Sequence, residues 1–133
     1  MKQRLGCLAV AASLCTLAAP VAACPLAPAD GDGLAGDGVT LAWRLADRPV
    51  IPLSEAFTID VQVCPPDADL LRVDAVMPAH RHGMNYQPSI ESLGPGRWRV
   101  RGLLWHMQGS WELRFETRQN GRIHTLRRAV ELP

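Results

Sequence analysis

The chain has 133 residues, a length typical of one domain. Its 14 basic and 13 acidic residues give a formal net charge of +1. This balance lacks the basic excess that nucleic-acid binders carry, so we expect no nucleic-acid partner.

The N-terminal residues have the pattern of an export signal. Lys2 and Arg4 precede an apolar, uncharged stretch from Leu5 to Leu17, and small residues follow it. The stretch is too short, and too soon interrupted by Pro20, to span a membrane. We therefore predict that residues 1–23 are a signal peptide removed on export to the periplasm, with an uncleaved N-terminal anchor as the alternative.

Two cysteines, Cys24 and Cys64, remain after the signal is removed. Because exported proteins meet an oxidising compartment, we predict a disulfide between them. Alternatively, the segment 21–24 resembles a bacterial lipoprotein cleavage site, in which case Cys24 carries a lipid anchor and Cys64 stays unpaired. We favour the disulfide because an unpaired exported thiol is reactive.

Residues 24–38 are rich in Pro, Gly and Asp and have no apolar period. We predict a flexible N-terminal tail there, followed by one domain at 39–133. The mature chain keeps twelve arginines against thirteen acidic residues, a formal charge of −1, because Lys2 and Arg4 leave with the signal.

From Val39 onward, apolar and polar residues alternate with the period of two that predicts β-strands. In the third segment, Leu71, Val73 and Ala75 are expected on one face. Asn120-Gly121 predicts a tight two-residue hairpin turn. The predicted strands are 39–45, 57–63, 70–76, 89–93, 97–102, 111–116 and 123–130.

A sustained helical period is missing, so the sequence predicts an all-β fold, an immunoglobulin-like antiparallel β-sandwich of about seven strands. We expect its core to include one face of four of the predicted strands. The core residues predicted are Trp43, Phe57, Ile59, Val61, Val100, Trp111, Leu113 and Phe115.

Metal-ligating residue types gather in two short segments. Apart from the initiator, the methionines are Met77, Met84 and Met107, and three of the four histidines are their neighbours. Scattered core methionines do not collect in this way. The segment 77–84 and the pair at 106–107 therefore stand out as candidates for chemistry. The histidines concerned are His80, His82 and His106.

These residue types favour copper. Thioethers are soft ligands that suit Cu(I), and imidazole also accommodates Cu(II). If residues 80–84 are extended, His80, His82 and Met84 project to one side, and His106-Met107 can close the site. We predict one metal site with copper as its cofactor. Its candidate ligands are Met77, His80, His82, Met84, His106 and Met107.

Other interpretations compete with this one. Met77 can instead be core filler, and His124 is expected to be a surface or sheet residue. Zinc would take the three clustered histidines with Asp74 or Glu91, but it does not explain the methionines. A blue-copper centre needs a thiolate, and both mature cysteines lie elsewhere in sequence.

We do not expect an enzyme. The sequence lacks a nucleophile with a plausible base, a close carboxylate pair and a phosphate-binding glycine loop.

The two Met/His segments also resemble a known family. Residues 74–85 read DAVMPAHRHGMN, and residues 103–113 read LLWHMQGSWEL. Over residues 39–130 the chain looks like the small exported domains called YtkA-like, which are related to the FixH-type proteins of oxidase assembly. The resemblance implies an immunoglobulin-like fold and copper handling. The membrane helix of FixH-type members has no counterpart here beyond the signal.

Two functions follow from the sequence. The first is a periplasmic protein that sequesters copper or delivers it to an acceptor protein such as an oxidase. The second is a metal-free interaction domain in which the Met/His loop and Trp105 contact a partner protein.

Overall fold

The computed structural model describes residues 24, 26–36 and 38–133, so the predicted signal peptide at 1–23 lies outside the described residues. Within these ranges there is no helix long and apolar enough to cross a membrane. The elements are one short 3-10 helix, η1 (Pro28–Asp30), and strands β1 (Asp32–Gly36), β2 (Val39–Leu45), β3 (Phe57–Cys64), β4 (Asp69–Met77), β5 (His82–Gly83), β6 (Ser89–Gly94), β7 (Arg97–Leu103), β8 (Gly109–Gln119) and β9 (Arg122–Leu132).

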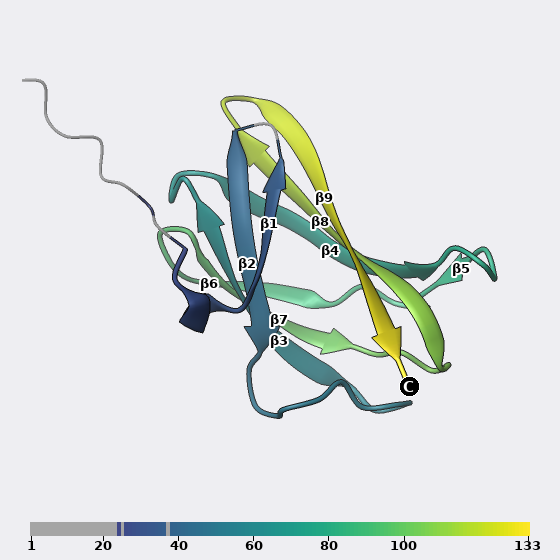
Figure 1. Ribbon diagram of the computed structural model, residues 1–133. Coiled ribbons are helices and arrows are strands. Elements are labelled where there is room, and N and C mark those ends of the chain that lie inside the picture. The colour runs from purple at the N-terminus through teal and green to yellow at the C-terminus, as the bar shows by residue number, and fades with distance from the viewer. Residues whose placement is uncertain (1–23, 25, 37) are drawn as a thin grey trace, which may run out of the picture.

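The strands form two antiparallel sheets that pack face to face (Figure 1). One sheet has the order β1-β2-β3-β7-β6 and the other β5-β4-β8-β9. The predicted all-β antiparallel sandwich is confirmed. The described residues contain nine strands rather than about seven, because β1 and the two-residue β5 were not predicted.

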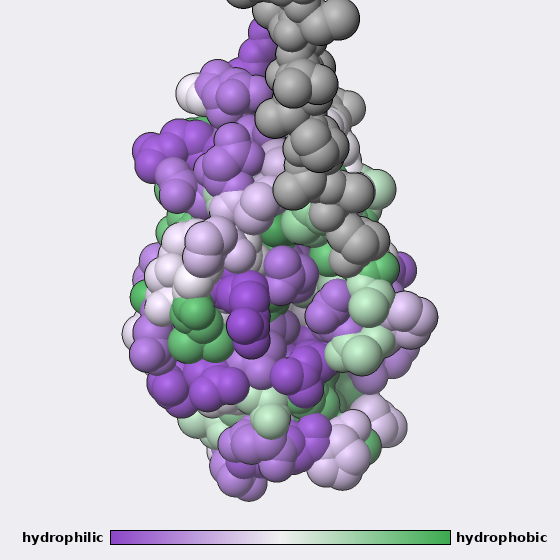
Figure 2. All heavy atoms as spheres, turned by 90° about the vertical axis from the view of Figure 1, so that its left-hand side faces the viewer, coloured by the Kyte–Doolittle hydropathy of each residue, from purple (hydrophilic) through white to green (hydrophobic). Residues whose placement is uncertain are grey.

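The core lies between the two sheets and follows the predicted alternation. All eight predicted core residues are buried, with exposed fractions of 9 % or less. Outward positions of the same strands are polar, and Figure 2 shows that hydrophilic residues cover most of the face on the left of Figure 1. The period of two in the sequence therefore divides interior from surface.

One predicted face was wrong at Leu71. Leu70, Val73 and Ala75 are buried, whereas Leu71 is 36 % exposed. A β-bulge between Leu70 and Arg72 shifts the pairing of β4 with β8, and a bulge changes which residue of a strand points inward.

The flexible tail predicted at 24–38 was wrong for residues 32–36, which form the edge strand β1. β1 pairs with β2 from Asp32 to Gly36. Arg128 on β9 holds it through bonds to the Asp32 carboxylate and to the carbonyl of Gly33. Apart from Leu34, which packs on the core, the residues of β1 are exposed. The sequence of this strand therefore has no alternation of apolar and polar residues that would predict it.

Cys24 and Cys64 form a disulfide, with their Cα atoms 5.6 Å apart. This confirms the predicted pairing and ties the N-terminal segment to the last residue of β3. The predicted hairpin turn is confirmed as well. Asn120 and Gly121 connect β8 to β9 with φ angles of 49° and 74°, the left-handed values that a tight reversed turn requires.

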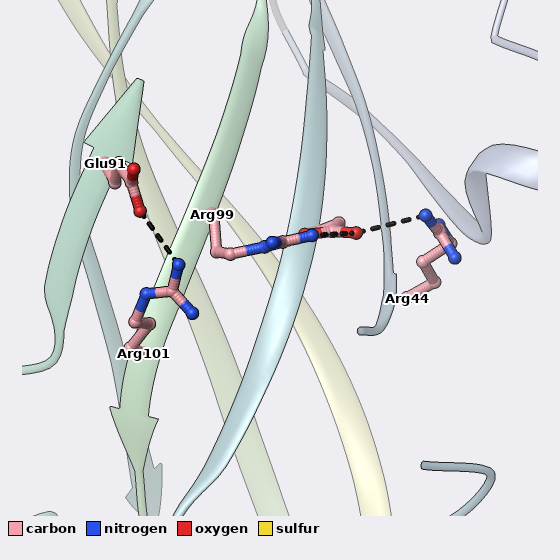
Figure 3. A network of polar contacts seen from close by, with 5 residues as sticks. Arg44, Glu91, Arg99 and Arg101 are labelled. Atoms are coloured by element: carbon pink, nitrogen blue, oxygen red, sulfur yellow. Dashed lines mark hydrogen bonds and ion pairs between the residues drawn. The ribbon is translucent and has the colours of Figure 1, made fainter. Parts of the chain in front are cut away.

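Ion pairs cross the outer face of the five-stranded sheet (Figure 3). Arg99 donates two hydrogen bonds to the Asp60 carboxylate at 2.8 and 3.2 Å, and Arg44 donates one at 3.0 Å. The three residues are direct neighbours on β2, β3 and β7. Hydrogen bonding by Arg99 and the nearby positive charges hold the pKa of Asp60 below its ordinary value, although burial acts in the opposite direction.

Replacing Trp111 by Ala should lower the free energy of unfolding by about 3 to 5 kcal/mol, because the side chain is fully buried and leaves a cavity. Ile123→Ala is the control, since Ile123 is 64 % exposed and a surface change costs about 0.5 kcal/mol or less. Denaturant unfolding measures both. Equal effects of the two changes would contradict this account of the core.

Asp60→Asn should reduce the dependence of stability on acid pH. Because the folded-state pKa of Asp60 is lowered, its stabilisation is present above the unfolded-state value of about 3.9 and is lost as pH falls through the folded-state pKa. The free energies of unfolding of wild type and Asp60→Asn should therefore differ at pH 7, and the difference should shrink as pH falls below the unfolded-state value of about 3.9.

Urea unfolding at several pH values measures this convergence. Arg99→Gln, which removes the main hydrogen-bond donor to Asp60, should show a similarly reduced pH dependence. A gap between wild type and Asp60→Asn that grows as pH falls below about 3.9 would overturn the assignment.

Candidate metal site

The first Met/His segment is a hairpin tip rather than an extended strand. β4 ends at Met77, residues 78–81 form a turn, and β5 follows. The backbone N–H of His80 donates to the carbonyl of Met77 at 3.1 Å, and Arg81 adopts a left-handed φ of 56°. The extended conformation considered for residues 80–84 therefore does not hold at His80, which lies in the turn.

His82 is the half-buried histidine of the segment. It stands opposite Met77 in the β4–β5 pairing, and directly opposite residues point to the same side of a sheet. Because Met77 is buried in the core, the His82 ring also points inward. Its Nδ1 atom is buried and has no hydrogen-bond partner among the described residues. A buried imidazole nitrogen without a partner is costly unless a ligand engages it.

Three imidazoles from two segments meet around His82. Its ring stacks on that of His106, with centroids 5.3 Å apart. The centroid of the His80 ring lies 5.7 Å from that of the His82 ring. His80 and His106 are exposed. The structure thus brings together the three histidines that sequence analysis grouped. His124 lies apart from them on β9, opposite Thr117 and toward the Asn120-Gly121 turn.

The loop that carries His106 is held by buried aromatic residues. Trp105 and Trp111 are fully buried and stack with centroids 5.2 Å apart at 8°. Trp111 donates its Nε1 hydrogen to the carbonyl of Met107 at 2.9 Å. On the other side, the backbone N–H of Ser54 donates to the carbonyl of Trp105 at 2.8 Å. His106 therefore projects from a loop that is fixed at both of its neighbours.

The methionines occupy two kinds of position. Met77 is 1 % exposed, and its terminal methyl lies so close to Gly109 that an added Cβ there would come within 3.2 Å. This burial matches the core alternative for Met77. Met84 and Met107 are half-buried and pack against the edge of the core. They adjoin the clustered histidines in sequence, so their thioethers stay candidates for ligands.

As they are placed in the structure, the three histidines do not form a metal site by themselves, and the described acidic residues do not complete one. Within the described ranges, no group of three or more His, Cys, Asp or Glu side chains is arranged to hold a metal ion. Asp74 accepts hydrogen bonds from Arg72 and from the N–H of Ala75, and Glu91 pairs with Arg101 on the other sheet. The structure therefore gives no support to zinc held by Asp74 or Glu91, and a metal here needs thioethers or an outside ligand.

Sequence reasoning placed Trp111 in the core but missed its contact with the histidines. The Trp111 ring lies 5.7 Å from His106 and 6.2 Å from His82, both in T-shaped arrangements. A signal was available, because Trp111 follows Met107 by four residues and starts the buried alternation of β8. This spacing in the sequence does not indicate in which direction the loop before Trp111 folds.

The comparisons with known proteins give no relative from which a function can be carried over. No protein-family model matches the chain, and no similar curated protein or solved structure was found. The geometry of the three imidazoles and their aromatic support is therefore the basis for a functional argument.

Proposed function

We propose that this protein binds copper, with Cu(I) favoured and Cu(II) accepted, and sequesters it or delivers it to an acceptor protein. The observation that carries the proposal is the proximity of the His80 and His106 rings to that of His82, whose buried Nδ1 atom has no hydrogen-bond partner among the described residues. An imidazole nitrogen freed from hydrogen bonding is a ligand for transition metals.

The donor set explains the choice of metal. Three imidazoles alone suit several metals, but Met84 and Met107 add soft thioethers next to them in sequence. A carboxylate to complete a zinc site is not provided by Asp74 or Glu91, which are engaged elsewhere. Soft thioethers together with imidazoles favour copper, and its reduced form most strongly.

Exposure of the outer ligands suits transfer. His80 and His106 are exposed, whereas His82 is half-buried between the turn and Trp111. An incoming ligand from an acceptor such as an oxidase can approach the exposed side while His82 keeps hold of the metal. Sites on loops that a rigid sandwich positions are a common way to carry such functions.

The alternative of a metal-free interaction domain gains less from the structure. That function uses Trp105 as part of a contact surface, but Trp105 is fully buried and stacked on Trp111. A buried indole cannot contact a partner protein without unfolding of the loop.

We place the proposed activity in the periplasm. The disulfide between Cys24 and Cys64 is compatible with an oxidising compartment, and it uses the sulfur atom through which a lipid anchor is attached. The likeness of the two Met/His segments to YtkA-like domains, for which copper handling is expected, agrees with this proposal.

Titration of the purified exported protein with Cu(I), in competition with a chelator, tests the proposal. We expect one ion to bind more tightly than micromolar. The double variant His80→Ala with His82→Ala should abolish binding, and His124→Ala is the control because His124 lies apart on β9. Wild-type binding no tighter than micromolar would sink the proposal, and loss of binding in the control would show that the site is elsewhere.

Met84→Leu should weaken the binding of Cu(I) more than the binding of Cu(II), because a thioether discriminates between metals by softness. The substitution keeps the volume of the side chain, so packing changes little. Met77→Leu is the matched control if the buried Met77 acts only in the core. Competition titrations with each oxidation state measure both variants, and equal losses for Cu(I) and Cu(II) in Met84→Leu would exclude Met84 as a ligand.

A further inference from the structure

Trp111 lies where the two halves of the candidate site meet. Its ring contacts that of His82 on the β4–β5 hairpin and that of His106 on the following loop. Its Nε1 hydrogen is donated to Met107, beside His106. One fully buried side chain therefore contacts both segments that supply the proposed ligands.

We infer that Trp111 is the positioning residue of this site, and that its indole ring makes the site prefer a soft monovalent ion. The inference rests on the proposed copper function and adds to it a role for Trp111 and a class of metal ion. Trp111 acts through the histidines that it orients.

The two halves of the candidate site are held in place by different contacts. The His82 hairpin is attached to β8 by strand pairing through β4, as in the pair Val76 and Glu112. In the described part of the chain, the His106 loop has only an isolated bridge between Trp105 and Leu53, and it is held by Ser54 and by the Trp111 N–H. Removing that N–H releases the carbonyl of Met107 and with it the placement of the neighbouring His106.

Trp105 packs in the core as Trp111 does, but no contact of its ring with a histidine ring is found in the described chain. Trp105 is as deeply buried as Trp111 and stacks on it. It contacts the ring of Phe57 with centroids 5.5 Å apart, and its own Nε1 has no hydrogen-bond partner among the described residues. Trp105 is thus a core residue of the same type and burial, and it provides a natural comparison.

The Trp111 ring also affects which metal ion the site prefers. The only polar atom of the Trp111 side chain is taken by Met107, so the indole presents carbon atoms to the two imidazoles. A fully buried ring also excludes water from that side of the site. An ion bound there exchanges water for imidazole and thioether beside an apolar ring, which favours soft Cu(I) over the more strongly hydrated Zn²⁺ and Cu²⁺.

The test compares Trp111→Phe with Trp105→Phe in the full exported protein. Without metal, NMR cross-relaxation between the rings of His82 and His106 reports their proximity. We expect it in the wild type and in Trp105→Phe, and we expect its loss in Trp111→Phe, which lacks the N–H. Denaturant unfolding of each variant measures the packing contribution separately.

With metal, competition titrations measure Cu(I), Ag(I) as a redox-inert substitute, and Zn²⁺. Trp111→Phe should weaken Cu(I) and Ag(I) at least about tenfold, a change of about 1.4 kcal/mol. Trp105→Phe should change them less, and Zn²⁺ affinity should not fall in parallel. Equal losses of affinity in the two variants, or unchanged ring proximity in Trp111→Phe, would overturn the positioning role.

Two further results separate this inference from the proposed function. If the wild type binds no copper while ring proximity is lost only in Trp111→Phe, the copper function fails and the positioning of the imidazoles stands. If Trp111→Phe binds Cu(I) as the wild type does, the inference fails and the copper function stands. Should Trp111→Phe not fold, 3-benzothienyl-alanine at position 111 keeps the ring size while removing the N–H, and the same outcomes apply.

Discussion

The stacked pair Trp105 and Trp111 is the contact on which the arrangement of this protein depends. One indole comes from the loop after β7 and the other from the start of β8, so the pair closes the end of the sandwich where the chain passes between sheets. Phe57, at the start of β3, extends the contact into the other sheet with an edge-on approach to Trp105. Aromatic side chains bury large areas and prefer such geometries, so this cluster fixes the loop between the two indoles.

The candidate site is built on that fixed end. A loop in a small sandwich is ordinarily the mobile part, but here both neighbours of His106 are hydrogen-bonded, Met107 to the buried Trp111 and Trp105 to Ser54. The hairpin with His82 is short, yet its register with β4 directs one ring inward. Two exposed imidazoles and one half-buried imidazole thus stand side by side, an arrangement that is compatible with the proposed binding and release of a metal ion.

Sequence reasoning captured the parts of the fold that depend on burial. The alternation at 57–63 and 111–116 reports directly which side chains face the core, because burial selects apolar residues there. The prediction failed where backbone hydrogen bonds, rather than burial, determine the structure. The edge strand β1 is held by pairing with β2 and by Arg128, and the bulge beside Leu71 is a change of register that no hydropathy pattern records.

For the candidate site, too, residue composition allowed a prediction, whereas the tertiary contacts could not be predicted. Unusual composition singled out the histidines of residues 80–82 and 106, since methionines and histidines rarely gather on short loops. Their actual approach depends on a turn at 78–81 and on the backfolding of the 104–108 loop, both of which are tertiary features. The contact of Trp111 with two imidazoles is likewise invisible in sequence, because a core tryptophan and a positioning tryptophan look alike there.

The disulfide and the clustered imidazoles lie at opposite ends of the molecule. β3 begins at Phe57 beside the aromatic pair and ends at Cys64, whose bond to Cys24 lies about a strand's length, roughly 25 Å, from that pair. Figure 1 shows the β5 hairpin and the N-terminal side of the domain at opposite ends of the sandwich. Any attachment made through the chain at Cys24 would therefore hold the domain at one end and leave the imidazoles at the opposite end.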